Sequence, residues 1–213
     1  MNRIILCGAV ENPPELSHRN YGRSFCRFTV CAARLSGACD HIPVLADCRL
    51  CENVKKGDVL YIEGEIRSFN DREAVHNRLK INVWAQSIHV WDGDSGNTAV
   101  LRGTLCRPAV YRRTPFGREI SDLMLCVPRQ YHSPVSGRYD YLPCIAWGSV
   151  ARLCASLPEG TEIELEGRLQ SRQYVKLIGG VPSERTAYEI SISSVSIPED
   201  VLEDEDREDL PDI

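Results

Sequence analysis

The chain has 213 residues, 43% of them hydrophobic, and a formal net charge of −5, which is enough material for two ordinary globular domains. No apolar run approaches the ~20 residues that a membrane-spanning helix needs, and the strand-like opening Ile4-Ile5-Leu6 lacks a signal-peptide layout, so we expect a cytoplasmic protein. For the same reason we expect the ten cysteines to be reduced thiols rather than a disulfide framework.

The charge is divided unevenly along the chain. Residues 198–213 hold nine acidic side chains and one basic one, a charge of −8, so the other residues sum to +3. Residues 1–96 carry 12 bases and 12 acids, whereas residues 97–197 carry 12 bases and 9 acids. A block of like charge is typical of a disordered interaction tail, which we expect for 198–213.

Two stretches of about 100 residues repeat one another. The segment Asn2–Gly8 returns as Asn97–Gly103, Asp40–Ala46 returns as Asp140–Ala146, and Gly57–Ile66 returns as Gly160–Leu169. The spacing between matching blocks grows along the chain, as in two copies of one domain whose strands match and whose loops differ. We therefore predict a first copy over 1–93, a second copy over 97–197 and a tail over 198–213.

The second copy predicts five strands and one helix, taken in chain order. Alternating apolar residues indicate strands over 99–105, 119–128, 139–147, 161–170 and 188–197. A short helix is indicated over 149–157, where apolar residues share one face. Residues 107–118, 131–138 and 171–185 are expected to be loops, because Pro and Gly punctuate them. Five strands with a helix between the third and fourth is the layout of the OB-fold. The predicted fold is therefore all-β, with two tandem five-stranded OB-fold barrels, each with a short helix between its third and fourth strands, and a disordered acidic tail.

Three segments resemble the bacterial single-stranded DNA-binding proteins. Asp140–Trp147 is similar to that family's third strand, Glu164–Tyr174 to its stretch V-E-G-R-L-x-T-R-x-Y/W, and Asn2–Gly8 to its opening. The resemblance implies binding of single-stranded DNA with little sequence preference, in replication, recombination and repair. It also implies assemblies that present four OB folds, so a chain with two folds is expected to form a homodimer, associated with the nucleoid.

The second copy offers the aromatic rings and cations that a non-specific binder of single strands needs. Tyr139, Tyr141 and Trp147 share one face of a strand, because alternate side chains point the same way, while Leu142 and its alternates form the buried face. The resemblance adds Tyr174 as a base-stacking residue. Further candidates are Phe116 for stacking and, for phosphates, Arg112, Arg113, Arg118, Arg129, Arg138, Arg168, Arg172 and Lys176.

The first copy departs from this pattern. Asp47 stands where the second copy has Trp147, and His41 stands where it has Tyr141. Asp71 falls near the position of Tyr174. We therefore expect the first copy to bind DNA weakly and to serve mainly in assembly or partner contact.

The tail resembles the acidic tip of the same family. There a terminal hydrophobic residue and its carboxylate anchor partner enzymes, so the resemblance implies contacts with replication and repair proteins. The predicted partner-binding residues are Asp209, Leu210, Pro211, Asp212 and Ile213.

Other chemistry finds less support in the sequence. A zinc cluster of Cys48-x-x-Cys51 with Cys39 and His41 lacks the spacing of a typical knuckle, so no metal is predicted. No phosphate-cradling loop or catalytic triad context is present, and we predict neither a cofactor nor an enzyme. Two other functions remain open: a protein-interaction scaffold of replication or mobile-element machinery with weak DNA affinity, and an OB-fold binder of RNA.

Overall fold

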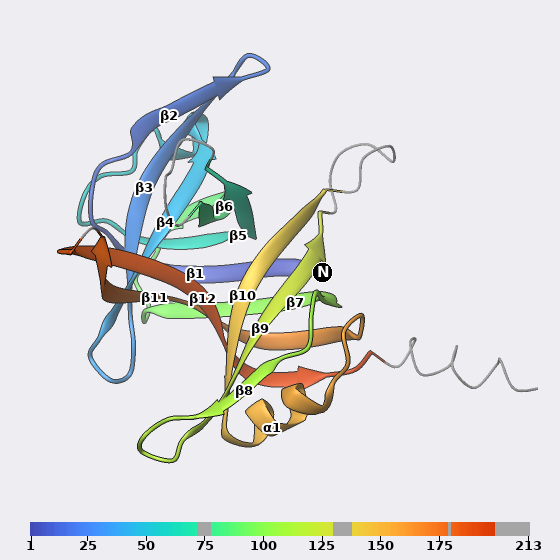
Figure 1. Cartoon of the computed structure of the whole chain (residues 1–213). Coiled ribbons are helices and arrows are strands. Elements are labelled where there is room, and N and C mark those ends of the chain that lie inside the picture. The colour runs from blue at the N-terminus through green and yellow to red at the C-terminus, as the bar shows by residue number, and fades with distance from the viewer. Residues whose placement is uncertain (72–77, 130–137, 179, 199–213) are drawn as a thin grey trace, which may run out of the picture. The chain divides into compact units, whose positions relative to one another are not determined.

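The computed structural model describes residues 1–71, 78–129, 138–178 and 180–198, and these are mostly β-strand (Figure 1). The strands are β1 (Asn2–Val10), β2 (Glu15–Asn20), β3 (Arg23–Ala33), β4 (Cys39–Asp47), β5 (Val59–Asn70), β6 (Leu79–Val90), β7 (Gly96–Leu105), β8 (Val110–Arg113), β9 (Glu119–Pro128), β10 (Tyr139–Trp147), β11 (Glu162–Ile178) and β12 (Val181–Ser196). A 3₁₀ helix, η1 (Cys48–Cys51), follows β4, and an α-helix, α1 (Gly148–Ser156), follows β10. Neither of these short helices has the length of a membrane-spanning segment.

Two compact units divide the chain. The N-terminal unit consists of Asn2–Ala99 together with Arg168–Ile190. We call the segment Arg168–Ile190 the hairpin arm. The C-terminal unit consists of Met1, Val100–Gly167 and the segment that begins at Ser191. The units therefore do not coincide with the two sequence copies, because the arm belongs to the second copy by sequence and to the N-terminal unit by contact.

The strands of the N-terminal unit close into a barrel. β1 pairs antiparallel with both β3 and β5, β3 pairs with β4, β5 pairs with β6, and β4 and β6 close the ring as a parallel pair through Val44 and Val83. The core is filled by alternate residues of these strands, such as the fully buried Ile4, Leu6 and Ile62. In the C-terminal unit the order β9-β10-β12-β11-β7 repeats this arrangement, and β7 pairs with β9. This strand order is that of an OB-fold barrel.

Residues that recur in both copies make the same contacts. The amide of Asn2 donates to the carbonyl oxygen of Ile66 (2.8 Å) and accepts from its N–H (2.9 Å), and Asn97 brackets Leu169 in the same way (2.6 and 3.1 Å). These bonds hold the first strand of each copy to the fourth.

The repeated aspartates are buried ion-pair partners. Asp140 is 0% exposed and accepts two hydrogen bonds from the guanidinium of Arg129 (2.7 and 3.0 Å). Asp40 is 1% exposed and pairs with Arg34 in the same manner. Each pair lies at the start of a copy's third strand, so these aspartates recur for a structural reason.

The helix of the first copy differs from the prediction. The second copy has the expected α-helix, which begins at Gly148 with a φ of +57°, a conformation that glycine adopts without strain. The first copy has Cys48 at the corresponding position and forms only the four-residue η1. The sharp turn that glycine permits is therefore confined to the second copy.

Two segments that were predicted as loops contain strands. Residues 171–185 belong largely to β11 and β12, which form the hairpin arm, and residues 107–118 contain β8, which pairs with β9 from Val110 to Arg113. The loop predicted at 131–138 lies outside the described residues except for Arg138. Pro115 and Gly117 mark the turn after β8 correctly, but the presence of Pro and Gly led to a loop being predicted where short strands pair.

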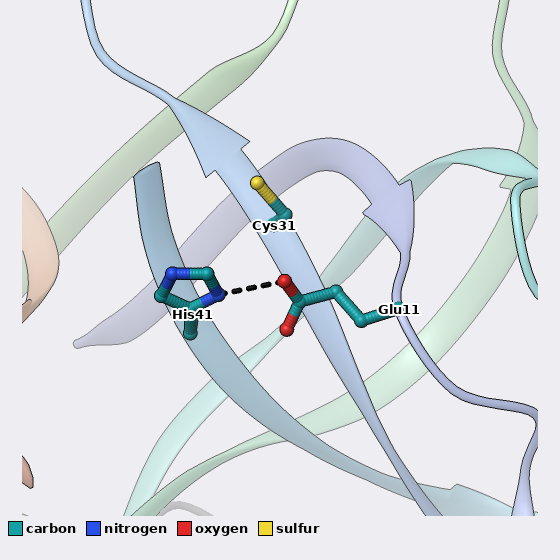
Figure 2. Close-up of side chains that lie close together, drawn as sticks. All are labelled: Glu11, Cys31 and His41. Atoms are coloured by element: carbon teal, nitrogen blue, oxygen red, sulfur yellow. Dashed lines mark hydrogen bonds and ion pairs between the residues drawn. The ribbon is translucent and has the colours of Figure 1, made fainter. Parts of the chain in front are cut away.

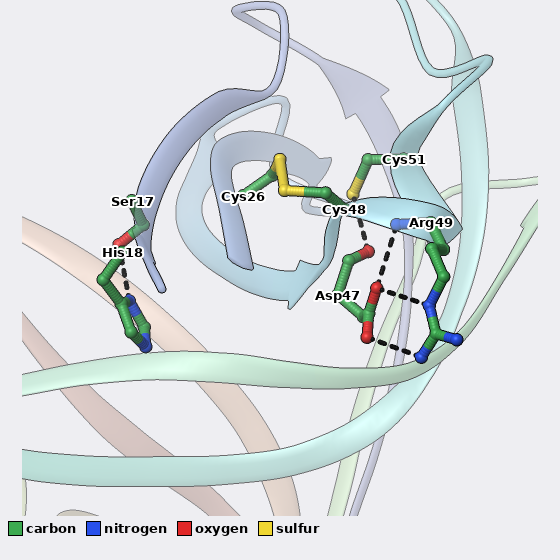
Figure 3. The surroundings of a disulfide bond; sticks show 7 residues. All are labelled: Ser17, His18, Cys26, Asp47, Cys48, Arg49 and Cys51. Atoms are coloured by element: carbon green, nitrogen blue, oxygen red, sulfur yellow. Dashed lines mark hydrogen bonds and ion pairs between the residues drawn. A yellow bond between two sulfur atoms is a disulfide. The ribbon is translucent and has the colours of Figure 1, made fainter. Parts of the chain in front are cut away.

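The expectation that all cysteines are free is wrong. Cys26 of β3 and Cys48 of η1 form a disulfide, which connects residues 22 apart in the sequence (Figure 3). The other eight cysteines are free. The sequence analysis considered Cys48 and Cys51 only together, as part of a zinc cluster, whereas in the structure the thiol of Cys51 contacts the carbonyl oxygen of Asp47. The barrel brings Cys26 to Cys48 through the pairing of β3 with β4.

Candidate nucleic-acid interface

The side chains of β10 divide between core and solvent as the sequence predicted. Leu142 and Ala146 are 0% exposed, whereas Tyr139, Tyr141 and Trp147 are 46%, 48% and 40% exposed. Since these three rings occupy alternate positions of one strand, they lie on one side of it. We call Tyr139, Tyr141 and Trp147 the ring face.

Trp147 is held at the junction of β10 and α1. Its backbone is extended, it lies opposite Ile120 in the pairing with β9, and the chain turns into the helix at the next residue. The main chain at Trp147 is thus fixed from both sides, while the indole keeps an accessible surface. A rigidly mounted, partly exposed ring is suited to stacking on a base.

Tyr141 lies opposite Cys126 of β9 and forms a hydrogen bond with its thiol. The pKa of the Tyr141 phenol is raised, chiefly by the nearby Cys126 thiol and secondly by partial burial. Burial also raises the pKa of Cys126, which contacts Cys106 as well. Both groups are therefore neutral near pH 7, so neither would repel phosphate.

The hairpin of β8 and β9 carries one exposed ring and three of the predicted cations. Phe116 is 93% exposed at its tip. Arg112 forms a 2.8 Å ion pair with Asp122, and Arg113 lies 3.4 Å from Glu119. Arg118 is exposed, and its side chain has no ion pair within the described residues. Arg118 is thus more available to a phosphate than its two neighbours.

The other predicted residues lie partly elsewhere. Arg129 is bound to Asp140, as described above, and Arg138 is exposed beside Tyr139 in the sequence. The remaining four belong to the hairpin arm and thus to the N-terminal unit: Arg168, Arg172, Tyr174 and Lys176. The structure therefore groups the predicted residues into two sets, one in each unit.

Within the arm, a cation and a ring are in contact. The guanidinium of Arg172 lies 5.6 Å from the ring centroid of Tyr174 and 3.6 Å from a carboxylate oxygen of Glu189. Lys176 is exposed, and Arg168 is half-buried. Tyr174 is half-buried too, with Arg172 already beside its ring.

Comparison with protein-family models concerns the second copy. Residues 96–198 match the model described as the single-strand binding protein family. The second copy belongs to the single-strand binding protein family. The match covers the ring face and the hairpin of β8 and β9.

Solved structures of single-strand binding proteins share the fold over nearly the whole chain. The wild-type single-stranded DNA binding protein from Thermus aquaticus superposes with a TM-score of 0.74 at 20% identity, over 93% of both chains. A deletion mutant of the Thermus aquaticus protein superposes with a TM-score of 0.72 at 20% identity, over 99% of this chain and 97% of its own. At this level of identity the likeness concerns the fold. A comparison with curated proteins finds no match.

At the positions that form the ring face in the single-strand binding copy, the first copy has Cys39, Asp47 and His41, and the only ring among them, the imidazole of His41, is hydrogen-bonded to Glu11. Asp47, which corresponds to Trp147, is 7% exposed and accepts hydrogen bonds from the guanidinium of Arg49 (2.9 and 3.0 Å; Figure 3) and from that of Arg23 (2.9 Å). Arg49, and then Arg23, hold the pKa of Asp47 well below its usual range. The Asp47 carboxylate is therefore ionised but neutralised by its partners, a structural role that the sequence did not reveal.

Proposed function

We propose that the protein binds single-stranded DNA with little sequence preference in replication, recombination and repair. The observation that carries the proposal is the ring face, three partly exposed aromatic residues along one strand of an OB-fold barrel. Membership of the second copy in the single-strand binding protein family supports it. Bases would stack on the ring face, and Arg118 and Arg138 would contact the flanking phosphates.

A fluorescence titration with oligo-dT tests the proposal. Trp147→Ala is expected to weaken binding by about 1–3 kcal/mol, roughly 5- to 150-fold, because a stacked base loses its platform. The quenching of tryptophan fluorescence by DNA should also shrink in this variant. Trp91→Ala is the matched control, since Trp91 is 36% exposed but packs against Tyr61 in the N-terminal unit. Equal losses from both variants would contradict the proposal.

Parallel titrations with oligo-U and duplex DNA separate the alternatives. Preference for oligo-U would favour the RNA-binding function. Uniformly weak binding that Trp147→Ala does not change would favour the interaction scaffold. The first copy also favours it, because Cys39, His41 and Asp47 stand there in place of the two tyrosines and the tryptophan of the ring face.

The assembly and partners belong to the same proposal. We infer a homodimer that presents four OB folds, with no catalytic activity and a location in the cytoplasm at the nucleoid. The residues proposed to bind replication and repair proteins, Asp209 to Ile213, lie outside the described residues. Their acidic and apolar character suits basic pockets with an apolar floor.

A further inference from the structure

Three side chains that commonly ligate metals lie on one face of the first copy's β3–β4 pair. Cys31 lies directly opposite His41, and Cys39 is two residues before His41 on the same strand. Since side chains two apart point the same way, Cys31, Cys39 and His41 share a face. Glu11 joins them from the end of β1, where Ala9 pairs with Cys31. Strand register thus gathers two thiols, an imidazole and a carboxylate.

The ligand atoms are also close in space. The Nδ1 atom of His41 lies 2.7 Å from the Oε1 atom of Glu11, and the donor atoms of Glu11, Cys31 and His41 all lie within 4.8 Å of one another (Figure 2). Cys39 is two residues before His41 on the same face, and its thiol lies beside that of Cys31. Tetrahedral zinc, with bonds of about 2.0–2.3 Å, needs ligand atoms roughly 3.3–3.8 Å apart. Small rotations of Glu11, Cys31 and His41 meet this requirement, and the side chain of Cys39 must turn towards them to supply the fourth ligand.

The second copy shows what this face holds when it is not built from metal ligands. Cys126 corresponds to Cys31, because it pairs with Tyr141 as Cys31 pairs with His41. Tyr141 and Tyr139 therefore stand in place of His41 and Cys39 and contribute to the ring face. The same face of the barrel therefore carries tyrosine rings in the second copy and potential metal ligands, thiols and an imidazole, in the first.

We propose that Glu11, Cys31, Cys39 and His41 form a binding site for Zn²⁺ in the N-terminal unit. Thiolate, imidazole and carboxylate are the ligand types that zinc prefers, and four of them complete a closed tetrahedral site. Bound Zn²⁺ would link the residue after β1 to β3 and β4. It would replace the hydrogen bond between His41 and Glu11, and the two thiols would release their protons to solvent.

The site also adjoins the anchor of the hairpin arm within this unit. The backbone N–H of His41 donates to the hydroxyl of Ser171 (2.9 Å), and the N–H of Ser171 donates to Asp40 (2.8 Å). Zinc bound to His41 would hold the strand to which the arm attaches. The role of this site is therefore structural, and it is distinct from the ring face of the second copy.

Zinc binding by the full chain tests the proposal directly. The protein is purified with a phosphine reductant, loaded with Zn²⁺ and titrated against a chromophoric chelator of micromolar affinity. About one Zn²⁺ per chain should be retained, and Co²⁺ should give the visible d–d and thiolate charge-transfer bands of a tetrahedral thiolate site. Cys31→Ser and His41→Tyr should each abolish both signals. His41→Tyr introduces the residue that the second copy tolerates at this place, so the barrel is expected to fold.

Two control variants separate this site from other thiols. Cys126→Ser changes the corresponding thiol of the second copy and should leave the Zn²⁺ content unchanged. The double variant Cys26→Ser with Cys48→Ser removes the two thiols that the reductant would free, and it should also retain the metal. The proposal is overturned if the wild type retains no Zn²⁺, if His41→Tyr keeps the metal while circular dichroism shows it folded, or if a control variant loses it.

Discussion

Cations on the C-terminal unit differ in how strongly they are already engaged. Arg112 shares two hydrogen bonds with the carboxylate of Asp122, at 2.8 and 3.3 Å, whereas Arg118 is exposed without an ion pair among the residues described. A phosphate competes with Asp122 for Arg112, whereas no acidic side chain of the described residues forms an ion pair with Arg118. Proximity to the ring-bearing fold is therefore not enough to make an arginine a DNA contact.

This difference predicts distinct effects of two similar substitutions. Arg118→Ala should weaken oligo-dT binding and reduce the slope of log affinity against log salt concentration by about one, because one phosphate contact is lost. Arg112→Ala should change the slope much less. Affinity measured at four or five salt concentrations checks both. A larger slope change for Arg112→Ala would reverse this assignment of the contacts.

The sequence predicted which side chains of β10 face solvent, but it did not predict the ion pairs that the charged residues of this strand form. Alternation of Tyr141 with Leu142 fixes the two faces of a strand, since the period is two residues. The pairing of Arg129 with Asp140 depends on the register of two strands joined by a loop, which alternation does not supply. The cluster of Glu11, Cys31 and His41 was missed because it too depends on strand register. Cys31 and His41 lie at similar distances in sequence from the turn between β3 and β4, which places them opposite one another.

At the level of strands, a repeated glycine marks a close crossing. A Cβ atom on Gly103 would lie 2.4 Å from the carbonyl oxygen of Cys126, and one on Gly8 would lie 2.2 Å from that of Cys31. No side chain fits there, because both neighbouring atoms belong to the backbone of the paired strand. The barrel therefore closes tightly between its first and second long strands only if this residue is glycine.

Gly103→Ala is accordingly expected to destabilise the C-terminal unit by about 1–3 kcal/mol, since the backbone must move apart. Gly96→Ala serves as the control, because the nearest atoms to its added Cβ are the side-chain atoms of Cys7 at 3.7 Å, an ordinary contact. Thermal unfolding followed by circular dichroism should show a midpoint several degrees lower for the first variant only. Equal midpoints would mean that β7 and β9 can separate at little cost.

The parts of strands that lie outside the barrel core were harder to predict than the strands that line it. Residues 171–178 of β11 were predicted as part of a loop because Gly179-Gly180 follow them, and in the structure their apolar side chains Val175 and Leu177 are exposed. A strand outside the core obtains its order from hydrogen bonds to its neighbour, and such bonds leave little trace in hydrophobic alternation. By contrast, β9 and β10 contribute alternate residues to the barrel core, and their predicted ranges match the structure.

Over the whole chain, charge is separated between the folded copies and the last residues. The residues up to 198 carry a net charge of +3 and residues 199–213 carry −8, which together give the total of −5. A net negative protein would attract DNA poorly over long distances, whereas the copies alone would not repel it. Since the acidic segment is covalently attached, we expect its carboxylates to compete with DNA phosphates at a high effective concentration.

Removal of residues 199–213 is therefore expected to increase affinity for oligo-dT at low salt, because the competitor for the cations is lost. The gain should shrink towards nothing near 1 M salt, where the Debye length falls to about 3 Å from about 10 Å at 0.1 M. A full-length variant with its nine acidic residues from Glu199 to Asp212 changed to Asn or Gln is the matched control. If charge is the cause, the control should bind as tightly as the truncated protein, whereas wild-type affinity in the control would show that the length of the segment, not its charge, limits access to DNA.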